Sequence, residues 1–242
     1  MIEPICRKSF KKRLCETDTI ARFKVTSFMS LLEYQRKRRF GITPEPSGKK
    51  RVTPAQGRGL IYVIQKHEAS HLHYDFRIEW NGVLLSWAVP KGPSLDPSMK
   101  RLATRVEDHP IDYASFEGVI PQNEYGAGTV MVWDKGIWAP ESREVDAALR
   151  KGELKFTLRG KKLKGSWVLV RIRAFGKKPS QSSWLLIKHR DRYALTEDVT
   201  KSEPYSATSH RLLVDIARDE GGDVKRAATG DPAATKHRLR RR

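Results

Sequence analysis

Eight short strand-like runs along the middle of the chain constrain its fold more than any other feature. They cover residues 60–66, 73–80, 83–89, 101–107, 129–134, 153–159, 166–173 and 183–189. Asn81-Gly82 separates two of these runs, a spacing typical of a tight hairpin with a primed turn. Many short strands joined by turns predict a mainly β fold, a closed or nearly closed antiparallel barrel. A few short helices are expected to flank it, at 29–39 and 141–150.

The run from residue 73 to residue 80 alternates strictly between polar and apolar side chains. Successive side chains of a strand point to opposite faces, so one face carries His73, Asp75, Arg77 and Glu79, and the other carries Tyr74, Phe76, Ile78 and Trp80. The aromatic face is expected to join the core. We expect a barrel with a polar lumen and apolar exterior segments, which would place the polar face at one mouth of the barrel.

The polar face of this run carries a set of groups suited to metal and phosphate binding. His67 lies six residues before His73, and two imidazoles with one carboxylate suit a divalent transition metal. The guanidinium of Arg77 offers a rigid fork for phosphate oxygens. These groups predict phosphoester chemistry. The alternative is a two-sided sheet whose outer face is merely solvated.

A second alternating segment carries further titratable groups. Arg101, Ala103, Arg105, Glu107 and His109 are predicted to share one face, opposite Leu102, Thr104 and Val106. Tyr113 follows in a turn opened by Pro110. Cations, an imidazole, a carboxylate and a phenol around one cleft suit phosphoryl transfer, in which catalysis is mostly positioning and charge stabilisation.

Long motifs around these residues resemble a known family. The matching stretches are 65–103, 106–138, 152–167 and 182–191, and the first contains His67-Glu-Ala-Ser-His71-Leu-His73-Tyr-Asp75-Phe-Arg77. From about Leu32 to about Asp191 the chain resembles the 3′-phosphoesterase domain of bacterial DNA ligase D, in its stand-alone form. The chain has no Lys-x-Asp-Gly nucleotidyl-transfer motif, so we do not expect it to be a ligase itself.

The resemblance implies a role for each matching position. It implies Mn²⁺ bound by His67, His73 and Asp75, although other divalent transition metals also suit these ligands. It implies phosphate contacts from Arg77, Arg101 and His109, with Tyr113 in the active site. Further positions near the substrate are Gln65, Lys91, Glu107 and Glu45. His71 matches no ligand, and we expect it at the surface.

One position departs from the family pattern. The family opens with Tyr-x-x-Lys-Arg-Asp-Phe-x-x-Thr-x-Glu-Pro, whereas this chain has Arg39 in place of the Asp and keeps Glu45. The pattern supplies acidic residues to the site. If that Asp helps to process a 3′ ribonucleotide, the substitution predicts that this step is weakened or lost.

The resulting hypothesis is a Mn²⁺-dependent phosphoesterase that removes a 3′ phosphate and a terminal 3′ ribonucleotide in non-homologous end joining. Arg77 and Arg101 would neutralise charge on the phosphate, and His109 would donate to an oxygen or protonate the leaving group. A water oriented by the metal or by Glu107 is the expected nucleophile. One alternative is a catalytically weakened DNA-binding module of the same pathway. Another is a non-haem iron oxygenase, because two His and one Asp can form a facial triad.

The net charge points to a polyanionic partner. The chain has 47 Lys and Arg against 28 Asp and Glu, which gives +19, and such a charge favours nucleic acid. The expected partners are DNA primer–templates or 3′ ends, with a separate DNA ligase and polymerase and a DNA-end-binding protein. We expect a monomer.

The ends of the chain are expected to be less ordered than its middle. Residues 1–30 are predicted to be a disordered basic extension, 31–195 the phosphoesterase domain, and 196–242 an extension with a helix at 208–218 and a basic disordered tail from Gly221. Cys6 and Cys15 make no disulfide framework, which favours a reducing cytoplasm, with nucleoid association on DNA. No apolar run approaches the length of a membrane span or resembles a secretory signal.

Overall fold

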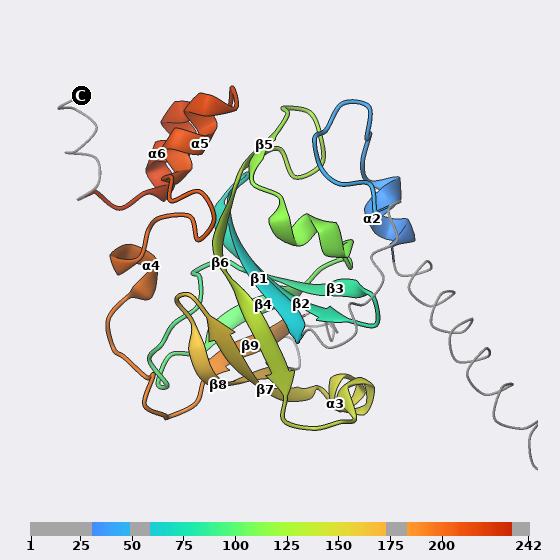
Figure 1. Ribbon diagram of the computed structural model, residues 1–242, viewed down its shortest axis with the longest axis vertical. Helices are drawn as coiled ribbons and strands as arrows, with labels where there is room; N and C mark the ends of the chain where they lie inside the picture. Colours follow the sequence, from blue (N-terminus) through green and yellow to red (C-terminus); the bar gives the residue numbers. More distant parts are fainter. Residues whose placement is uncertain (1–30, 49–58, 173–182, 234–242) are drawn as a thin grey trace, which may run out of the picture.

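The fold is organised around a closed antiparallel β-barrel (Figure 1). The computed structural model describes residues 31–48, 59–172 and 183–233. The barrel strands are β1 (Leu60–Glu68), β2 (Leu72–Trp80), β3 (Val83–Val89), β4 (Arg101–Arg105), β6 (Gly128–Pro140), β7 (Glu153–Gly160), β8 (Lys164–Arg171) and β9 (Ser183–Lys188). They pair in the order β1-β2-β3-β4-β9-β8-β7-β6, and β6 pairs back with β1 to close the barrel. The predicted mainly β barrel is confirmed.

The turn between β2 and β3 follows the sequence prediction closely. Trp80 pairs with Val83, so Asn81 and Gly82 form a two-residue loop. Both have positive φ angles, 49° and 79°, as the primed turns of hairpins require. β5 (Gly118–Ile120) was not predicted; this strand of three residues pairs with the first residues of β6.

The barrel interior is apolar, so the prediction of a polar lumen is wrong. Tyr74, Phe76 and Ile78 of β2 belong to the main core cluster, together with rings from the other strands. Phe76 stacks on Phe156 of β7, with ring centroids 5.7 Å apart. The apolar faces of the strands converge on this core. The polar face of β2 consequently lies on the outside of the barrel rather than at its mouth.

A second layer covers this outer face. It consists of α2 (Leu32–Arg36), the loop that follows it, and the 3₁₀ helix η1 (Ile111–Ser115). A separate apolar cluster fills the space between this layer and the barrel: Tyr34, Leu84, Ile111, Tyr113, Phe116, Ile120 and Val130. Both faces of β1 and β2 are therefore buried. The helix predicted at 29–39 exists but is shorter, as is α3 (Val145–Lys151), predicted at 141–150.

The C-terminal segment folds against the barrel as α4 (Val199–Ser202), α5 (Leu213–Asp219) and α6 (Val224–Gly230). The helix predicted at 208–218 is α5, which begins later than expected. The prediction of disorder from Gly221 is wrong as far as residue 233, because Asp223 accepts a hydrogen bond from the Arg226 backbone N–H at 2.9 Å and caps α6. The predicted disorder of 1–30 and of 234–242 lies outside the described residues.

A buried ion pair ties this segment to β1. Lys66 Nζ lies 3.2 Å from Asp231 Oδ1, and both side chains are almost fully buried. Asp231 also accepts hydrogen bonds from the backbone N–H groups of Leu213 and Val214, at 3.3 and 2.9 Å. The carboxylate thus joins the start of α5 to the barrel. No helix in the described ranges is long and apolar enough to cross a membrane.

Candidate metal and phosphate site

Three of the predicted ligands meet at the end of the β1–β2 pair. His67 lies directly opposite His73, and Gln65 lies opposite Asp75. One ligand atom from each of His67, His73 and Asp75 lies within 4.8 Å of the others. His67 Nδ1 and His73 Nε2 are each 3.7 Å from an Asp75 carboxylate oxygen. The antiparallel register therefore assembles a set that could hold a divalent metal ion.

Backbone carbonyls fix the orientation of both imidazoles. His67 Nε2 lies 2.9 Å from the Gly126 carbonyl, and His73 Nδ1 lies 2.9 Å from the His71 carbonyl. In each pair the nitrogen must donate, so in the neutral imidazole the other nitrogen, on the Asp75 side, has a lone pair available for a metal ion. Gly126 can present its carbonyl here because its φ is +77°, a conformation that favours glycine. The exposed side chain of His71 lies at the surface, as predicted.

Arg77 links the ligand set to the phosphate-binding candidates. Its Nη2 donates to Asp75 Oδ2 at 3.0 Å, and its Nε donates to Gln65 Oε1 at 2.8 Å. Its Nη1 lies 2.9 Å from His109 Nδ1. Gln65, buried beneath, donates to the carbonyls of Tyr113 and Phe116 at 3.0 and 2.8 Å. Gln65 thus holds the guanidinium in place, and two of the five N–H groups of Arg77 have no partner in these contacts.

His109 lies between two guanidinium groups. Its Nε2 is 3.3 Å from Arg38 Nη2, and its Nδ1 is 2.9 Å from both Arg77 Nη1 and the Glu107 carbonyl. Burial and the positive charges of Arg77 and Arg38 hold the pKa of His109 well below its usual value. The imidazole is therefore neutral near pH 7 and can donate one hydrogen bond.

The outer layer contributes Arg38, the residue before Arg39 in the family's opening motif. The sequence did not predict it as a site residue. Arg38 stacks on the Tyr34 ring at 3.8 Å and donates to Glu45 Oε1 at 2.8 Å. Glu45 also accepts from Tyr113 Oη at 3.0 Å. Glu45 and Tyr113 are thus buried behind Arg38, where burial and the Glu45 charge raise the pKa of Tyr113 well above its usual value.

Glu107 pairs with two cations of the outer layer. Its carboxylate lies 3.3 Å from both Lys37 Nζ and Arg38 Nη1, and it is almost fully covered. Lys37 remains partly exposed and also pairs with Glu33 at 2.7 Å. The structure therefore brings together nearly all of the predicted site residues: Glu45, Gln65, His67, His73, Asp75, Arg77, Glu107, His109 and Tyr113.

Arg101 does not share a face with His109, contrary to the predicted alternation. Ala103 belongs to the barrel core whereas Leu102 is 46% exposed, so the odd-numbered face of β4 points inward. The strand ends at Arg105, and the irregular residues after it turn His109 outward to bridge with Leu84. No hydrogen bond or ion pair joins Arg101 to Arg77 or His109 within the described residues. Lys91 is exposed in the turn that follows β3. The roles predicted for Arg101 and Lys91 stay predictions.

Arg39, which replaces the family's Asp, has no hydrogen bond or ion pair with the ligand set among the described residues. Its guanidinium forms an ion pair with Glu124 in the loop between β5 and β6, and 62% of its side chain is exposed. The candidate metal ligands, Arg77 and His109 come together although the family's Asp is replaced.

Electrostatics support an ionised carboxylate among the ligands. Asp75 is buried, which opposes its charge, yet Arg77 and the two imidazoles hold its pKa well below the usual range. His73 is also largely buried, but the negative charge of Asp75, 3.7 Å away, raises the pKa of the imidazole above its usual value. Protons and a metal ion would therefore compete for His73.

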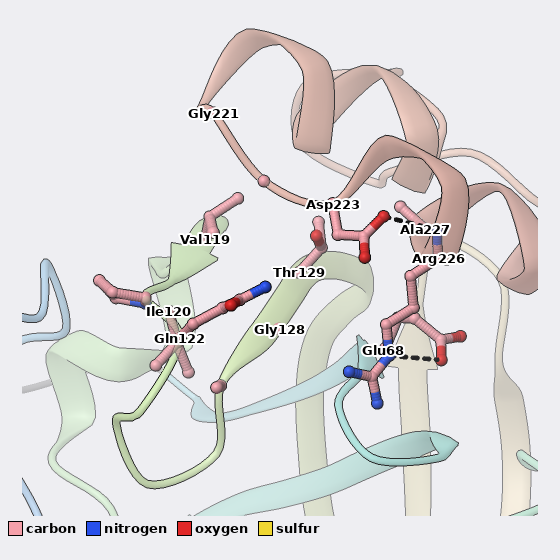
Figure 2. A pocket seen from close by; sticks show the side chains of 13 residues that line it. Glu68, Val119, Ile120, Gln122, Gly128, Thr129, Gly221, Asp223, Arg226 and Ala227 are labelled. Atoms are coloured by element: carbon pink, nitrogen blue, oxygen red, sulfur yellow. Dashed lines mark hydrogen bonds and ion pairs between the residues drawn. The ribbon is translucent and has the colours of Figure 1, made fainter.

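A pocket of about 500 Å³ lies beside this site but does not contain it (Figure 2). It opens between the β5–β6 loop and the turn from α5 to α6, and Gln122, Gly128, Asp223 and Arg226 are among its lining residues. Glu68 also lines it and lies 3.7 Å from Arg226 Nε. None of the predicted site residues lines this pocket.

Comparison with known families accounts for this arrangement. Residues 65–171 match the family described as DNA Ligase D 3′-phosphoesterase domain. This part of the chain is similar in sequence to that family. The matched residues of the phosphoesterase domain include the three candidate metal ligands, Arg77 and His109, whereas α2 and the C-terminal helices lie outside the match.

The curated relatives that this chain matches are several times longer than the matched segment. The multifunctional non-homologous end joining protein LigD of Pseudomonas aeruginosa is 54% identical over 189 residues, which cover 76% of this chain and 22% of that protein. The corresponding DNA repair protein of Mycobacterium tuberculosis is 45% identical over 141 residues, 58% of this chain and 18% of that protein. The chain thus spans about a fifth of the length of these relatives, and the stand-alone form stays a prediction.

Proposed function

We propose that the chain is a metal-dependent 3′-phosphoesterase that processes DNA 3′ ends in non-homologous end joining. The observation that carries the proposal is the contact of a two-His, one-Asp set with Arg77, whose guanidinium also reaches His109. The family description and the names of the relatives support the same reaction class and pathway. The proposed substrates are ends with a 3′ phosphate or a terminal ribonucleotide. The proposed partners are a DNA ligase, a polymerase and a DNA-end-binding protein.

His67, His73 and Asp75 fit a divalent transition metal, and we propose Mn²⁺. Two neutral nitrogens and one ionised oxygen converge, and a carbonyl holds each imidazole in the required tautomer. When bound, the ion supplies Lewis-acid stabilisation of charge on a phosphate oxygen. The carboxylate suits Mn²⁺ and the two imidazoles suit divalent transition metals in general, so the choice of Mn²⁺ rests on the family resemblance.

Arg77 and Arg38 are the proposed phosphate clamp. Each is held by a carboxylate, Arg77 by Asp75 and Arg38 by Glu45, so both guanidinium groups are oriented before a substrate arrives. The N–H groups of Arg77 not used within the protein can donate to non-bridging oxygens, where charge develops during phosphoryl transfer. Preorganised donors cost no reorganisation during the reaction.

His109 is proposed to donate a hydrogen bond to a phosphate oxygen. Burial and the charges of Arg77 and Arg38 lower its pKa and keep it neutral, and a neutral imidazole still carries one N–H. A bound phosphate would offset the two guanidinium charges and raise the pKa of His109, which would let it protonate a leaving oxygen. Glu107 would orient Lys37 and Arg38 and is the remaining candidate to position the attacking water.

The charge balance of the cluster favours an anionic substrate once a metal is bound. The covered part of the cluster holds three cationic side chains and three carboxylates, Lys37, Arg38 and Arg77 with Asp75, Glu45 and Glu107, while the more exposed Glu33 also pairs with Lys37. A divalent ion would add two positive charges to this cluster, which would favour binding of a phosphate anion. This added charge and the guanidinium clamp favour phosphate over the dioxygen chemistry of a non-haem iron site.

A 3′-end assay with matched variants tests the proposal. Labelled primer–templates ending in a 3′ phosphate or in one ribonucleotide would be incubated with Mn²⁺ or with a chelator. We expect turnover with Mn²⁺, loss of turnover with His73→Ala, and unchanged turnover with His71→Ala, because only the backbone of His71 contacts the site. Absence of turnover on both primers, or turnover that persists in His73→Ala, would refute the proposed enzyme.

A second candidate function is a DNA-binding module with weakened catalysis. Arg39 is the observation behind it, since it adds a cation where the family has an acid and points outward. Salt-sensitive DNA binding without metal-dependent turnover would favour this candidate. If the lost acid affects only the ribonucleotide step, Arg39→Asp should raise that step and leave 3′-phosphate removal unchanged.

A further inference from the structure

Tyr125 is the one aromatic residue among the large hydrophobic side chains that the described part of the chain exposes. It lies in the loop between β5 and β6, and 49% of it is accessible. It belongs to neither hydrophobic cluster, and none of the ring–ring contacts found among the described residues includes it. Core packing therefore does not account for an aromatic ring here.

Tyr125 precedes the residue whose carbonyl contacts a candidate metal ligand. The carbonyl of the following residue, Gly126, lies 2.9 Å from His67 Nε2. The turn takes its shape from backbone conformation, with positive φ at Asn123 and Gly126, rather than from burial of the Tyr125 side chain. The ring is thus one residue away from the group that orients a metal ligand, and it stays open to solvent.

Two cations of the proposed phosphate site approach the same ring. Lys37 Nζ lies 4.9 Å from the ring centroid and 3.5 Å from its hydroxyl. Arg38 Cζ lies 5.6 Å from the centroid, and Arg38 also contacts His109. An accessible aromatic ring bordered by cations is the combination with which proteins bind single nucleic-acid strands, because bases stack on the ring while cations follow the phosphates.

We propose that Tyr125 is a stacking platform for a nucleobase at the 3′ end of the processed strand, an inference that rests on the proposed function. A phosphate held by Arg77 and Arg38 would leave its nucleoside beside the β5–β6 loop, where the ring of Tyr125 is accessible. Stacking is tolerant of sequence because every base has a π face. Tyr125 would position the strand end and take no part in bond breaking.

A fluorescence titration tests the contact without turnover. The probe is a primer–template whose 3′-terminal base is 2-aminopurine, followed by a 3′ phosphate, titrated in the presence of a chelator. We expect quenching by the unaltered protein and by Tyr125→Phe. Tyr125→Ala should lose the quenching and about tenfold in affinity. Ile137→Ala removes another exposed side chain, on β6, and serves as the control. Unchanged quenching with Tyr125→Ala would overturn the proposal.

An abasic 3′ terminus separates stacking from a structural role. With this primer the unaltered protein should lose about as much affinity as Tyr125→Ala loses with the normal primer, and the two changes should not add. Additive losses, or a lowered unfolding midpoint that accounts for the weaker binding, would overturn the proposal. Quenching without Mn²⁺-dependent turnover would refute the proposed reaction and keep the stacking contact, whereas turnover without quenching would do the reverse.

Discussion

The two faces of β2 are both buried, yet they are held by different forces. The inner face packs Tyr74, Phe76 and Ile78 into the barrel core, where contacts are many and non-directional. The outer face buries Asp75 and Arg77 through hydrogen bonds to specific atoms of Gln65 and His109. Alternate residues of one strand thus belong to an apolar core on one side and to a buried polar network on the other.

The difference shows how a barrel can hold a site on its outside. Charged groups are costly to bury unless each is paired: Asp75 pairs with Arg77 on the same strand, and Arg38 pairs with Glu45 in the outer layer. Because Arg77 keeps donors beyond those that the protein uses, its network is stable without substrate and can still bind one. The inner-face side chains Tyr74, Phe76 and Ile78 pack within the apolar core and are not available to bind a substrate.

The largest effect is expected from the inner face. Phe76→Ala removes a fully buried ring stacked on Phe156 and should lower the free energy of unfolding by about 3–5 kcal/mol. Urea unfolding followed by tryptophan fluorescence measures the loss. Ile137→Ala, on an exposed face of β6, should change stability little. A loss below about 1 kcal/mol for Phe76→Ala would show that the core repacks around the cavity.

Removing the guanidinium of the outer face should cost activity more than stability. Arg77→Met eliminates the proposed phosphate donors, and kcat/KM for 3′-phosphate removal should fall about 10²- to 10³-fold. Arg159→Met makes the same chemical change on the exposed face of β7 and should leave kcat/KM unchanged. Full activity per folded molecule in Arg77→Met would place Arg77 in the scaffold alone.

Acidification should weaken the outer face through His109. The folded protein holds this imidazole neutral, whereas the unfolded chain protonates it below its ordinary pKa of 6.5. The contribution of His109 to stability is therefore complete above that pH and is lost as the pH falls toward the depressed pKa, by up to about 1.4 kcal/mol per pH unit. Urea unfolding of the metal-free protein between about pH 5 and pH 7 would measure this slope.

His109→Asn is the variant that assigns this pH dependence. It keeps a polar side chain without a titratable ring, so the difference in slope between the two proteins should come from His109. His73 has a raised pKa, so its contribution to stability changes only above pH 6.5, and the slopes of the two proteins are compared below that pH. An unchanged slope in His109→Asn would contradict the depressed pKa.

The smallest effect is expected where the outer face meets solvent. Lys37 pairs with Glu33 and Glu107 but is partly exposed, so Lys37→Ala should reduce stability by less than about 1 kcal/mol. Lys155→Ala, which breaks a more exposed pair with Glu153, is the control. A loss above about 2 kcal/mol for Lys37→Ala would mean that the buried network extends to the surface of the outer layer.

The prediction that the aromatic face of β2 joins the core is confirmed, whereas the prediction that the barrel lumen is polar is wrong. Alternation of Asp75 with Phe76 is a local property of one strand. It separates the side chains into two opposite faces but does not show which face points toward the barrel axis. The position of the barrel axis depends on the apolar faces of strands far apart in the chain. The prediction of a polar lumen failed because alternation does not reveal that α2 and η1 cover the outside.

Local irregularities account for the other differences. The alternation through His109 was extended beyond the true end of β4 at Arg105, and the irregular residues that follow changed the face. β5 is too short to leave a periodic signal. The helix α6 follows a glycine pair, which suggested disorder, although Asp223 at its N-cap was a readable signal. The metal ligands were predicted correctly as a cluster because they lie close together in sequence.

That closeness in sequence also bears on the order of folding. His67 and His73 are six residues apart, whereas Arg38 and His109 are separated by 71 residues. Closing the longer loop costs about 2 kcal/mol more in chain entropy. The candidate metal ligands can therefore assemble within one hairpin before the barrel closes, while the phosphate clamp needs the complete fold. The metal content of a preparation would consequently overestimate the fraction of its molecules that are active.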